Sequence, residues 1–327
     1  MKMSEIIFTE SKILQWARLG SRAVYGQTLL ELAGHDPSII AISADLGNSS
    51  GLDRFKAAFP DRFINVGIAE QNMIGVASGL AKEGFTVFAS SFAPFISMRS
   101  GEQIRMNLGY MRHNVKAVGI GSGLAMGFLG NSHFGTEDLA IMLAIPNVTV
   151  ISPSDTTEVV KAVVQSSDFY GPVYIRLTGL PGDPLVNQSD YKFEIGKINR
   201  MVEGEQVSII ATGSMVAQAI GASRILSSFG ISASVANMHT LKPVDSDYLL
   251  ELIKKRVPIY TVEEHSIVGG LGSTVASFIS EKDFSIPIRK IGIPDQYGQT
   301  GDYQFLKSIY GLTAEAIASR IQQDIAN

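Results

Sequence analysis

The 327-residue sequence contains no cysteine, which excludes disulfide bonds and thiolate ligands for a metal ion and favours a reducing compartment. It has no strong excess of either charge, since 27 lysines and arginines face 31 aspartates and glutamates. A nucleic-acid-binding surface with clustered basic residues is therefore not expected. No apolar stretch reaches the roughly 20 residues of a membrane span, and no signal peptide is evident at the N-terminus. These absences favour a cytoplasmic protein that binds neither nucleic acid nor membrane.

What the sequence does contain is apolar material arranged in alternating strand and helix patterns. Apolar residues make up 45% and charged residues 18% of the chain, enough for about two packed domains. The first half is predicted to contain strands at 38–44, 63–66, 85–89, 115–120, 148–152 and 173–177, with helices at 21–33 and 155–165. Strands that alternate with helices imply a mainly parallel sheet covered on both faces.

A glycine- and proline-rich run at 179–184, followed by polar residues up to Tyr191, is the best linker candidate. The pattern then restarts, with strands at 207–211, 232–236, 259–262 and 286–291 and helices at 215–229, 246–255 and 314–325. The predicted fold is therefore α/β with two domains, 10–185 and 192–327, each a mainly parallel sheet flanked by helices.

Glu70 follows an apolar strand and a glycine turn. Phe63–Val66 precedes Gly67, and Glu70 opens a helical pattern that continues through Met73 and Ile74. Two rigid elements hold a carboxylate at such a corner, so it can be fixed against a bound ligand. An acid at a helix start is also a favourable partner for the helix dipole. The residues alone leave both interpretations open.

Further candidates lie downstream. Phe92 and Phe95 are three residues apart at the expected head of the next helix, which would place both rings on one side. They either pack in the core or form an aromatic wall for a flat heterocycle. His133 lies on a glycine-rich loop, as a surface residue or as a group that moves protons near neutral pH. The sequence contains no His-Glu-x-x-His zinc motif, no complete dinucleotide fingerprint and no Walker phosphate loop.

The order of these segments resembles the transketolase family. The segments shared with its pyrimidine-binding domain are Ala44-Asp45-Leu46, Val66–Gln71, Phe92 with Phe95, Ser132-His133 and Ile175-Arg176-Leu177. The second half, at 211–214 and 261–272, is similar to the C-terminal domain of transketolases and of deoxyxylulose-phosphate synthase. The resemblance covers nearly the whole chain.

The resemblance implies thiamine diphosphate (ThDP) as cofactor. Glu70 would hydrogen-bond N1′ of its aminopyrimidine ring and thereby activate it. Phe92 and Phe95 would stack on that ring. Asp45 would lie near the cofactor where two chains meet.

The resemblance also implies a sugar substrate with a phosphate or another anionic group. His133 would face the reacting hydroxyl of the donor sugar. Arg22, Ser49 and Arg176 match positions that hold the substrate phosphate, a task that suits the paired donors of a guanidinium. Leu129 stands where transketolases have an aspartate that reads a substrate hydroxyl, so the family's sugar selectivity does not transfer.

Members of the family hold the diphosphate through Mg²⁺ (or Ca²⁺) and a Gly-Asp-Gly … Asn-Asn motif in an N-terminal domain. Oxygen ligands suit such a hard cation, but this sequence contains no such motif. We therefore expect a partner, an N-terminal diphosphate-binding transketolase subunit, to hold the metal. By family analogy the two chains would form an α₂β₂ heterotetramer with a β–β contact.

The expected function is that of one subunit of a two-component, ThDP-dependent transketolase. It would transfer a two-carbon ketol unit from a ketose to an aldose acceptor. The alternative is the β subunit of a 2-oxo acid dehydrogenase, or a decarboxylating enzyme similar to deoxyxylulose-phosphate synthase. A non-catalytic assembly subunit and a nicotinamide-binding protein are rivals from other classes.

Overall fold

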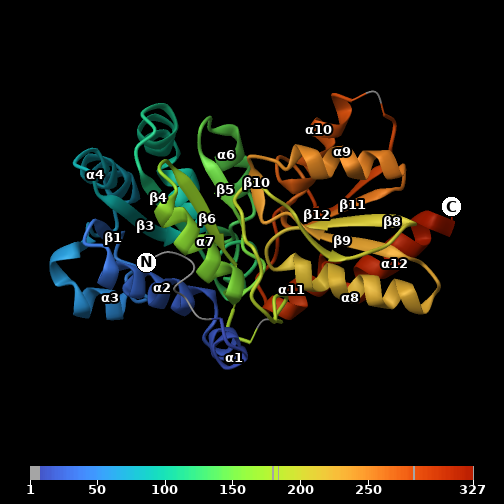
Figure 1. The fold of residues 1–327 in the computed structure, drawn as a ribbon, viewed down its shortest axis with the longest axis horizontal. Coiled ribbons are helices and arrows are strands. Elements are labelled where there is room, and N and C mark those ends of the chain that lie inside the picture. Colours follow the sequence, from blue (N-terminus) through green and yellow to red (C-terminus); the bar gives the residue numbers. More distant parts are fainter. Residues whose placement is uncertain (1–7, 179, 183, 283, 327) are drawn as a thin grey trace.

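Two open β-sheets, one from each half of the chain, lie next to each other in the computed structural model (Figure 1). The structure describes residues 8–178, 180–182, 184–282 and 284–326. Helices cover both faces of each sheet, and most neighbouring strands are parallel. The predicted architecture of two α/β domains is confirmed.

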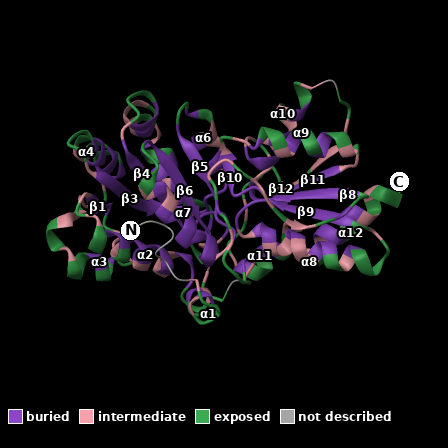
Figure 2. Ribbon diagram, in the orientation of Figure 1, coloured by how far each residue is buried: buried purple, intermediate pink, exposed green. Residues whose placement is uncertain are grey.

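In the described part of the chain, the first sheet has seven strands. In spatial order these are β10 (Thr240–Lys242), β5 (Thr149–Ile151), β6 (Val173–Leu177), β4 (Val115–Ile120), β3 (Thr86–Phe92), β1 (Ile39–Ser43) and β2 (Phe63–Asn65). All pairs are parallel except β10 with β5. The central strands are buried along their whole length, which explains their continuous apolar sequences (Figure 2).

The two faces of this sheet carry different sets of helices. One face is covered by α1 (Glu10–Leu19), α2 (Ser21–His35), α3 (Asp53–Ala58) and α7 (Thr156–Asp168). The other is covered by α4 (Glu70–Lys82), α6 (Asp138–Ala144) and an irregular helical stretch made of η3 (Phe95–Arg99), α5 (Gly101–Gln103) and η4 (Ile104–Tyr110).

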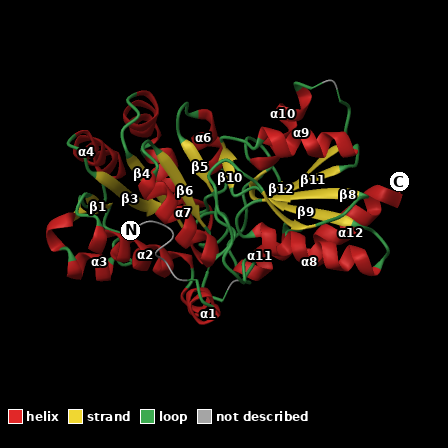
Figure 3. Cartoon of the chain, viewed as in Figure 1, coloured by secondary structure: helices red, strands yellow, loops and turns green. Residues whose placement is uncertain are grey.

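The second sheet has five strands among the described residues. In spatial order these are β12 (Ile288–Ile293), β11 (Ile259–Ser266), β8 (Val207–Ala211), β9 (Ala233–Asn237) and β7 (Asn199–Val202), with β7 antiparallel to β9. Helices α9 (Ser246–Lys255) and α10 (Leu271–Ser280) cover one face, and α8 (Met215–Ser228), α11 (Tyr303–Ile309) and α12 (Ala314–Ala326) the other (Figure 3). No described helix has the length and apolarity needed to cross a membrane.

Two structural features join the halves. Strand β10 belongs to the second half of the sequence but pairs with β5 at the edge of the first sheet. The apolar core under α4 and α6 also continues into α9 and α10. The boundaries 10–185 and 192–327 stay a prediction, and in space residues 240–242 lie with the first domain.

Several element boundaries differ from the sequence prediction. Helix α2 passes through Gly34, which was expected to end it, because Leu32 and Ala33 pack in the core and the Asp36 N–H still bonds the Leu32 carbonyl. Strand β3 runs three residues further than expected and includes Phe92. Strands β7 and β10 and helices α1, α3, α10 and α11 were not predicted.

Candidate active site

The candidate site residues lie where neighbouring parallel strands end. Asp45 follows β1, Glu70 follows β2, Phe92 ends β3 and the loop with His133 follows β4. The sheet order β4-β3-β1-β2 brings these four strand ends side by side. In open α/β sheets the crevice beyond the carboxyl ends of the strands is the usual ligand site.

A short turn between β2 and α4 positions Glu70. The Asn65 side chain accepts hydrogen bonds at 3.0 Å from the N–H groups of Asp45 and Gly67, and its amide donates to Asp45 Oδ1. It thereby ties the ends of β1 and β2 to the turn that leads into Glu70. Asn65 was not among the predicted residues, although an asparagine just before a glycine turn is a recognisable signal.

Glu70 is 5% exposed and pairs with an arginine. Arg99 Nη1 lies 3.1 Å from Glu70 Oε1, and the Arg99 side chain is 50% exposed. The same guanidinium lies over the Phe95 ring, 3.8 Å from its centroid. Arg99 was not among the predicted residues. The sequence signal that could have found Arg99 is its position four residues after Phe95, because residues four apart lie on one side of a helix.

Phe92, Phe95 and His133 form an aromatic cluster. The ring centroids are 5.7 Å apart for Phe92–Phe95, 5.6 Å for Phe92–His133 and 5.1 Å for Phe95–His133, all edge to face. The expectation that both phenylalanines begin one helix was wrong, since Phe92 ends β3 and Phe95 opens the π-helical η3. The two rings nevertheless lie together at the junction of β3 and η3.

His133 is half-buried, and its pKa lies below the ordinary value because of burial and the nearby positive charge of Arg99. The imidazole is therefore neutral at neutral pH and can accept a proton. Its Nδ1 lies 2.9 Å from Ser132 Oγ. A loop of the second domain contacts the His133 loop: the Asn131 side chain donates to the Gly298 carbonyl at 2.6 Å and accepts from the Gly298 N–H at 2.9 Å.

Arg22 and Ser49 are brought together at the start of α2. Arg22 Nη1 lies 3.4 Å from the Ser49 carbonyl oxygen, and both residues line a surface pocket of about 260 Å³. The close approach of α2 to the loop that carries Ser49 depends on two glycines, Gly26 and Gly51. A Cβ at Gly26 would lie 1.9 Å from the Gly51 oxygen, so no larger residue could stand there.

Arg176 has a different environment from the one expected of a substrate ligand. It is 1% exposed, and its guanidinium bonds Asp138, Thr178 and the carbonyl oxygens of Gly135 and Glu264. These protein groups occupy its donors at the contact between the two domains. A substrate role for Arg176 is therefore not favoured by this geometry.

The side chains around Glu70 fit a flat heterocycle with a ring nitrogen. A buried carboxylate can bond such a nitrogen, and the neighbouring aromatic rings offer stacking surfaces. Among the described residues, no group of three or more histidines and acids is placed to hold a metal ion. The site as described can bind and orient a heterocycle and move a proton at it.

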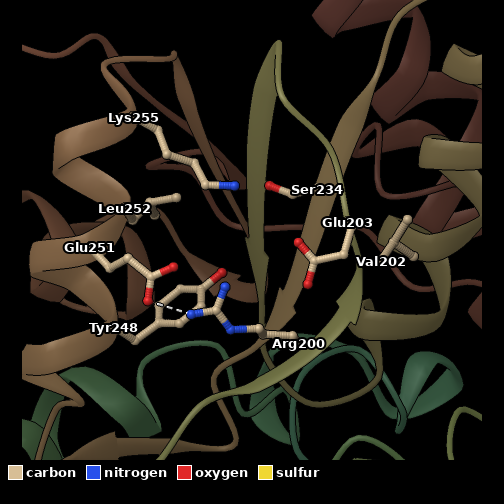
Figure 4. A pocket seen from close by; sticks show the side chains of 8 residues that line it. All are labelled: Arg200, Val202, Glu203, Ser234, Tyr248, Glu251, Leu252 and Lys255. Atoms are coloured by element: carbon tan, nitrogen blue, oxygen red, sulfur yellow. Dashed lines mark hydrogen bonds and ion pairs between the residues drawn. The ribbon is translucent and has the colours of Figure 1, made fainter.

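A separate small pocket lies in the second domain between β7, β9 and α9 (Figure 4). Arg200 pairs there with Glu251 at 2.5 Å and lies 5.0 Å from the Tyr248 ring centroid. The cavity measures about 10 Å³, room for one water molecule at most. Two of its charged side chains, Arg200 and Glu251, already pair with each other, so it is not a substrate site as it stands.

Comparison with known proteins identifies the family of this two-domain chain. Residues 18–179 match the transketolase pyrimidine-binding domain, and residues 196–317 match the transketolase C-terminal domain. The transketolase C-terminal section of Methanocaldococcus jannaschii is 42% identical over 94% of this chain and 96% of its own length. The chain belongs to the transketolase family.

Other similar proteins are also named as transketolases or transketolase subunits. The 6-deoxy-6-sulfo-D-fructose transketolase subunit SqwH of Clostridium sp. (strain MSTE9) is 40% identical over 90% of this chain and 91% of its own. A split-gene transketolase, solved as an inactive β4 tetramer, superimposes with a TM-score of 0.83 at 41% identity, over 93% of this chain and 97% of that one. Transketolase from Campylobacter jejuni shares the fold, with a TM-score of 0.79 at 21% identity, and this chain spans 46% of it.

Proposed function

We propose that this chain is the pyrimidine-binding subunit of a two-component, ThDP-dependent transketolase. The observation that carries the proposal is the buried Glu70 carboxylate beside the cluster of Phe92, Phe95 and His133. The full-length match to transketolase C-terminal sections and subunits supports it.

In this proposal Glu70 hydrogen-bonds the N1′ nitrogen of the aminopyrimidine ring and exchanges a proton with it. Phe92 and Phe95 provide the stacking surfaces, and Asp45 lies at the rim, where a second chain approaches. When bound, the cofactor supplies the carbon nucleophile and the electron sink for breaking and forming carbon–carbon bonds. The neutral imidazole of His133 accepts and returns the proton of the donor sugar's hydroxyl.

The partner subunit holds the diphosphate through Mg²⁺ or Ca²⁺, and the active complex is an α₂β₂ heterotetramer with a β–β contact. Two relatives that this chain covers almost completely are named as subunits, which supports a separate partner. The likeness to about half of a one-chain transketolase agrees with the same division of the active site.

The substrate is a ketose with an anionic end, and the reaction moves its two-carbon ketol unit to an aldose. Arg22 and Ser49 line one pocket and are the residues we assign to the anion. Relatives named for a sulfo sugar and for apulose 4-phosphate both act on sugars with an anionic group. Arg176 is left out of this assignment, because its donors bond protein groups.

The test is Glu70→Gln in the complex reconstituted with the diphosphate-binding partner. Loss of the proton-exchanging group should lower turnover by about 10²–10⁴-fold, with far-UV circular dichroism and complex assembly unchanged. Glu102→Gln is the matched control, because Glu102 is an exposed acid that pairs with Arg105. Near-normal turnover by the Glu70→Gln complex would refute the assignment.

A second candidate is a synthase that decarboxylates pyruvate. The 1-deoxy-D-xylulose-5-phosphate synthase of Caldanaerobacter subterraneus is 35% identical over 92% of this chain, which spans 48% of that enzyme. Assays with ketose phosphates and with pyruvate, each with an aldehyde acceptor, separate the two functions. We expect turnover with the ketose phosphates and none with pyruvate.

A further inference from the structure

Arg99 makes two contacts at the candidate site at the same time. Its Nη1 atom lies 3.1 Å from the carboxylate of Glu70, and its guanidinium carbon lies over the Phe95 ring, 3.8 Å from the centroid. Glu70 and Arg99 differ in burial, with side chains that are 6% and 50% exposed. The arginine therefore links the buried acid to the solvent.

These are the two contacts that the proposed function gives to the aminopyrimidine ring. That ring is flat, stacks on an aromatic wall and bonds Glu70 through a nitrogen. A guanidinium is also flat, stacks on aromatic rings and bonds carboxylates. Arg99 and the pyrimidine would thus compete for the same carboxylate and the same aromatic surface.

We propose that Arg99 occupies the pyrimidine position in the cofactor-free chain and has to move out when the cofactor binds. This inference rests on the proposed function and concerns the loading of that site. In the empty chain Arg99 gives the buried Glu70 carboxylate a charged partner, which a buried charge requires.

The protonation chemistry agrees with displacement. The N1′ nitrogen of a neutral aminopyrimidine is a hydrogen-bond acceptor, so a hydrogen bond to Glu70 needs a proton on one of the two groups. A carboxylate that bonds a guanidinium has no proton to donate. Departure of Arg99 therefore clears the ring face and also lets Glu70 take up the shared proton.

Arg99 has the freedom to leave. Half of its side chain is in solvent, where ion pairs are weak, and the side chain is long and flexible. The position of Glu70, in contrast, is fixed by the turn at Gly67 and by α4. Movement of the Arg99 side chain alone is enough to free the Glu70 carboxylate and the Phe95 ring.

The experiment measures ThDP binding rather than turnover. In the reconstituted complex with saturating Mg²⁺, equilibrium dialysis gives the ThDP dissociation constant of the wild type, Arg99→Met, Arg99→Lys and the control Arg105→Met. Arg105 is an exposed arginine six residues further on, and it pairs with Glu102. We expect Arg99→Met to bind at least threefold more tightly, Arg99→Lys to lie between, and Arg105→Met to match the wild type.

Salt provides an internal check, because it screens the exposed side of the Arg99–Glu70 pair. Raising NaCl from 50 to 500 mM should narrow the difference in ThDP dissociation constant between the wild type and Arg99→Met. Equal or weaker ThDP binding by Arg99→Met overturns the inference about Arg99.

The Glu70→Gln variant separates this inference from the proposed function. If Arg99→Met binds ThDP no more tightly but Glu70→Gln abolishes turnover, the proposed function stands and only the inference about Arg99 falls. A complex that binds no ThDP in any variant refutes the inference and the proposed function alike.

A second readout uses the chain alone. The positive charge of Arg99 contributes to the lowered pKa of His133, so Arg99→Met should raise the midpoint of the His133 ring signals in an NMR titration. Arg105→Met should leave that midpoint unchanged. An unmoved midpoint in Arg99→Met would mean that the guanidinium does not lie at the site in solution, and the inference would fall.

Discussion

At the scale of single residues, Arg176 shows how surroundings decide a role that a motif leaves open. A guanidinium suits a substrate phosphate and a buried carboxylate equally well. Here Nε lies 2.9 Å from Asp138 Oδ2, and both Arg176 and Asp138 are at most 1% exposed. Nη2 also bonds the carbonyl of Glu264 in the second domain at 2.9 Å. The residue holds the two domains together.

Replacing Arg176 with Met should therefore destabilise the fold. The change leaves the Asp138 carboxylate buried without its cation, which typically costs about 3–5 kcal/mol. Guanidinium chloride unfolding followed by circular dichroism measures this loss. The exposed control Arg105→Met should stay within about 0.5 kcal/mol of the wild type. Unchanged stability together with a raised KM for the sugar substrate would restore the predicted substrate role.

At the scale of elements, the sequence indicated the long buried strands and the amphipathic helices, because their patterns are local. Strand β10 could not be found this way, since three residues become a strand only by pairing with β5 about 90 positions earlier. Helix α10 was missed because its start depends on Glu263, which accepts hydrogen bonds from the N–H groups of Leu271 and Gly272.

The same distinction holds for the candidate site. Glu70, Phe92 and His133 belong to an ordered set of motifs that can be read along the chain. The spacing of Arg99 from Phe95 can be read along the chain, but the pairing of Arg99 with Glu70 depends on a contact between η3 and the head of α4, which that spacing does not record. The burial of Arg176 likewise depends on the packing of β6 against the second domain.

The loop that carries His133 gives a prediction at this scale. Asn131 donates to the Gly298 carbonyl and accepts from the Gly298 N–H, and the Gly301 N–H bonds the Gly127 carbonyl. A Cβ at Gly298 would lie 2.3 Å from Tyr310 Oη, so a larger residue there would have to displace the Tyr310 side chain. The second domain thus fixes the loop on which His133 stands.

Asn131→Ala removes both side-chain bonds, and we expect it to lower kcat of the reconstituted complex about tenfold while changing stability by about 1–2 kcal/mol. The His133 ring signals should broaden or shift in NMR spectra, which a purely structural loss elsewhere would not cause. Ser280→Ala, which removes an exposed bond to the Ser277 carbonyl in α10, serves as the control. Unchanged His133 signals and kcat would mean that the loop holds its shape without the second domain.

At the scale of the whole molecule, the two halves behave as one packed body. Glu264 of β11 accepts bonds from the Leu124 N–H in the first domain, from Ser214 ahead of α8 and from Tyr303 of α11, at 2.6–2.7 Å. Burial raises the pKa of Glu264 against the effect of these donors. A carboxylate satisfied from three segments requires those segments to be assembled together.

The chain should accordingly unfold in a single transition, although it has two sheets. Trp16, the one tryptophan of the sequence, is buried in α1 of the first domain, so its fluorescence follows that domain, whereas far-UV circular dichroism follows helices of both. We expect the two probes to give the same denaturation midpoint.

A substitution in the shared core tests the same point. Leu241→Ala, in β10 and fully buried, should lower both midpoints together, at a cost of about 2–5 kcal/mol, because it opens a cavity in the core that the halves share. Leu250→Ala on the partly exposed side of α9 is the control and should have a small effect. Separate midpoints, or a Leu241→Ala change seen only by circular dichroism, would show that the domains fold independently and that β10 is a peripheral contact.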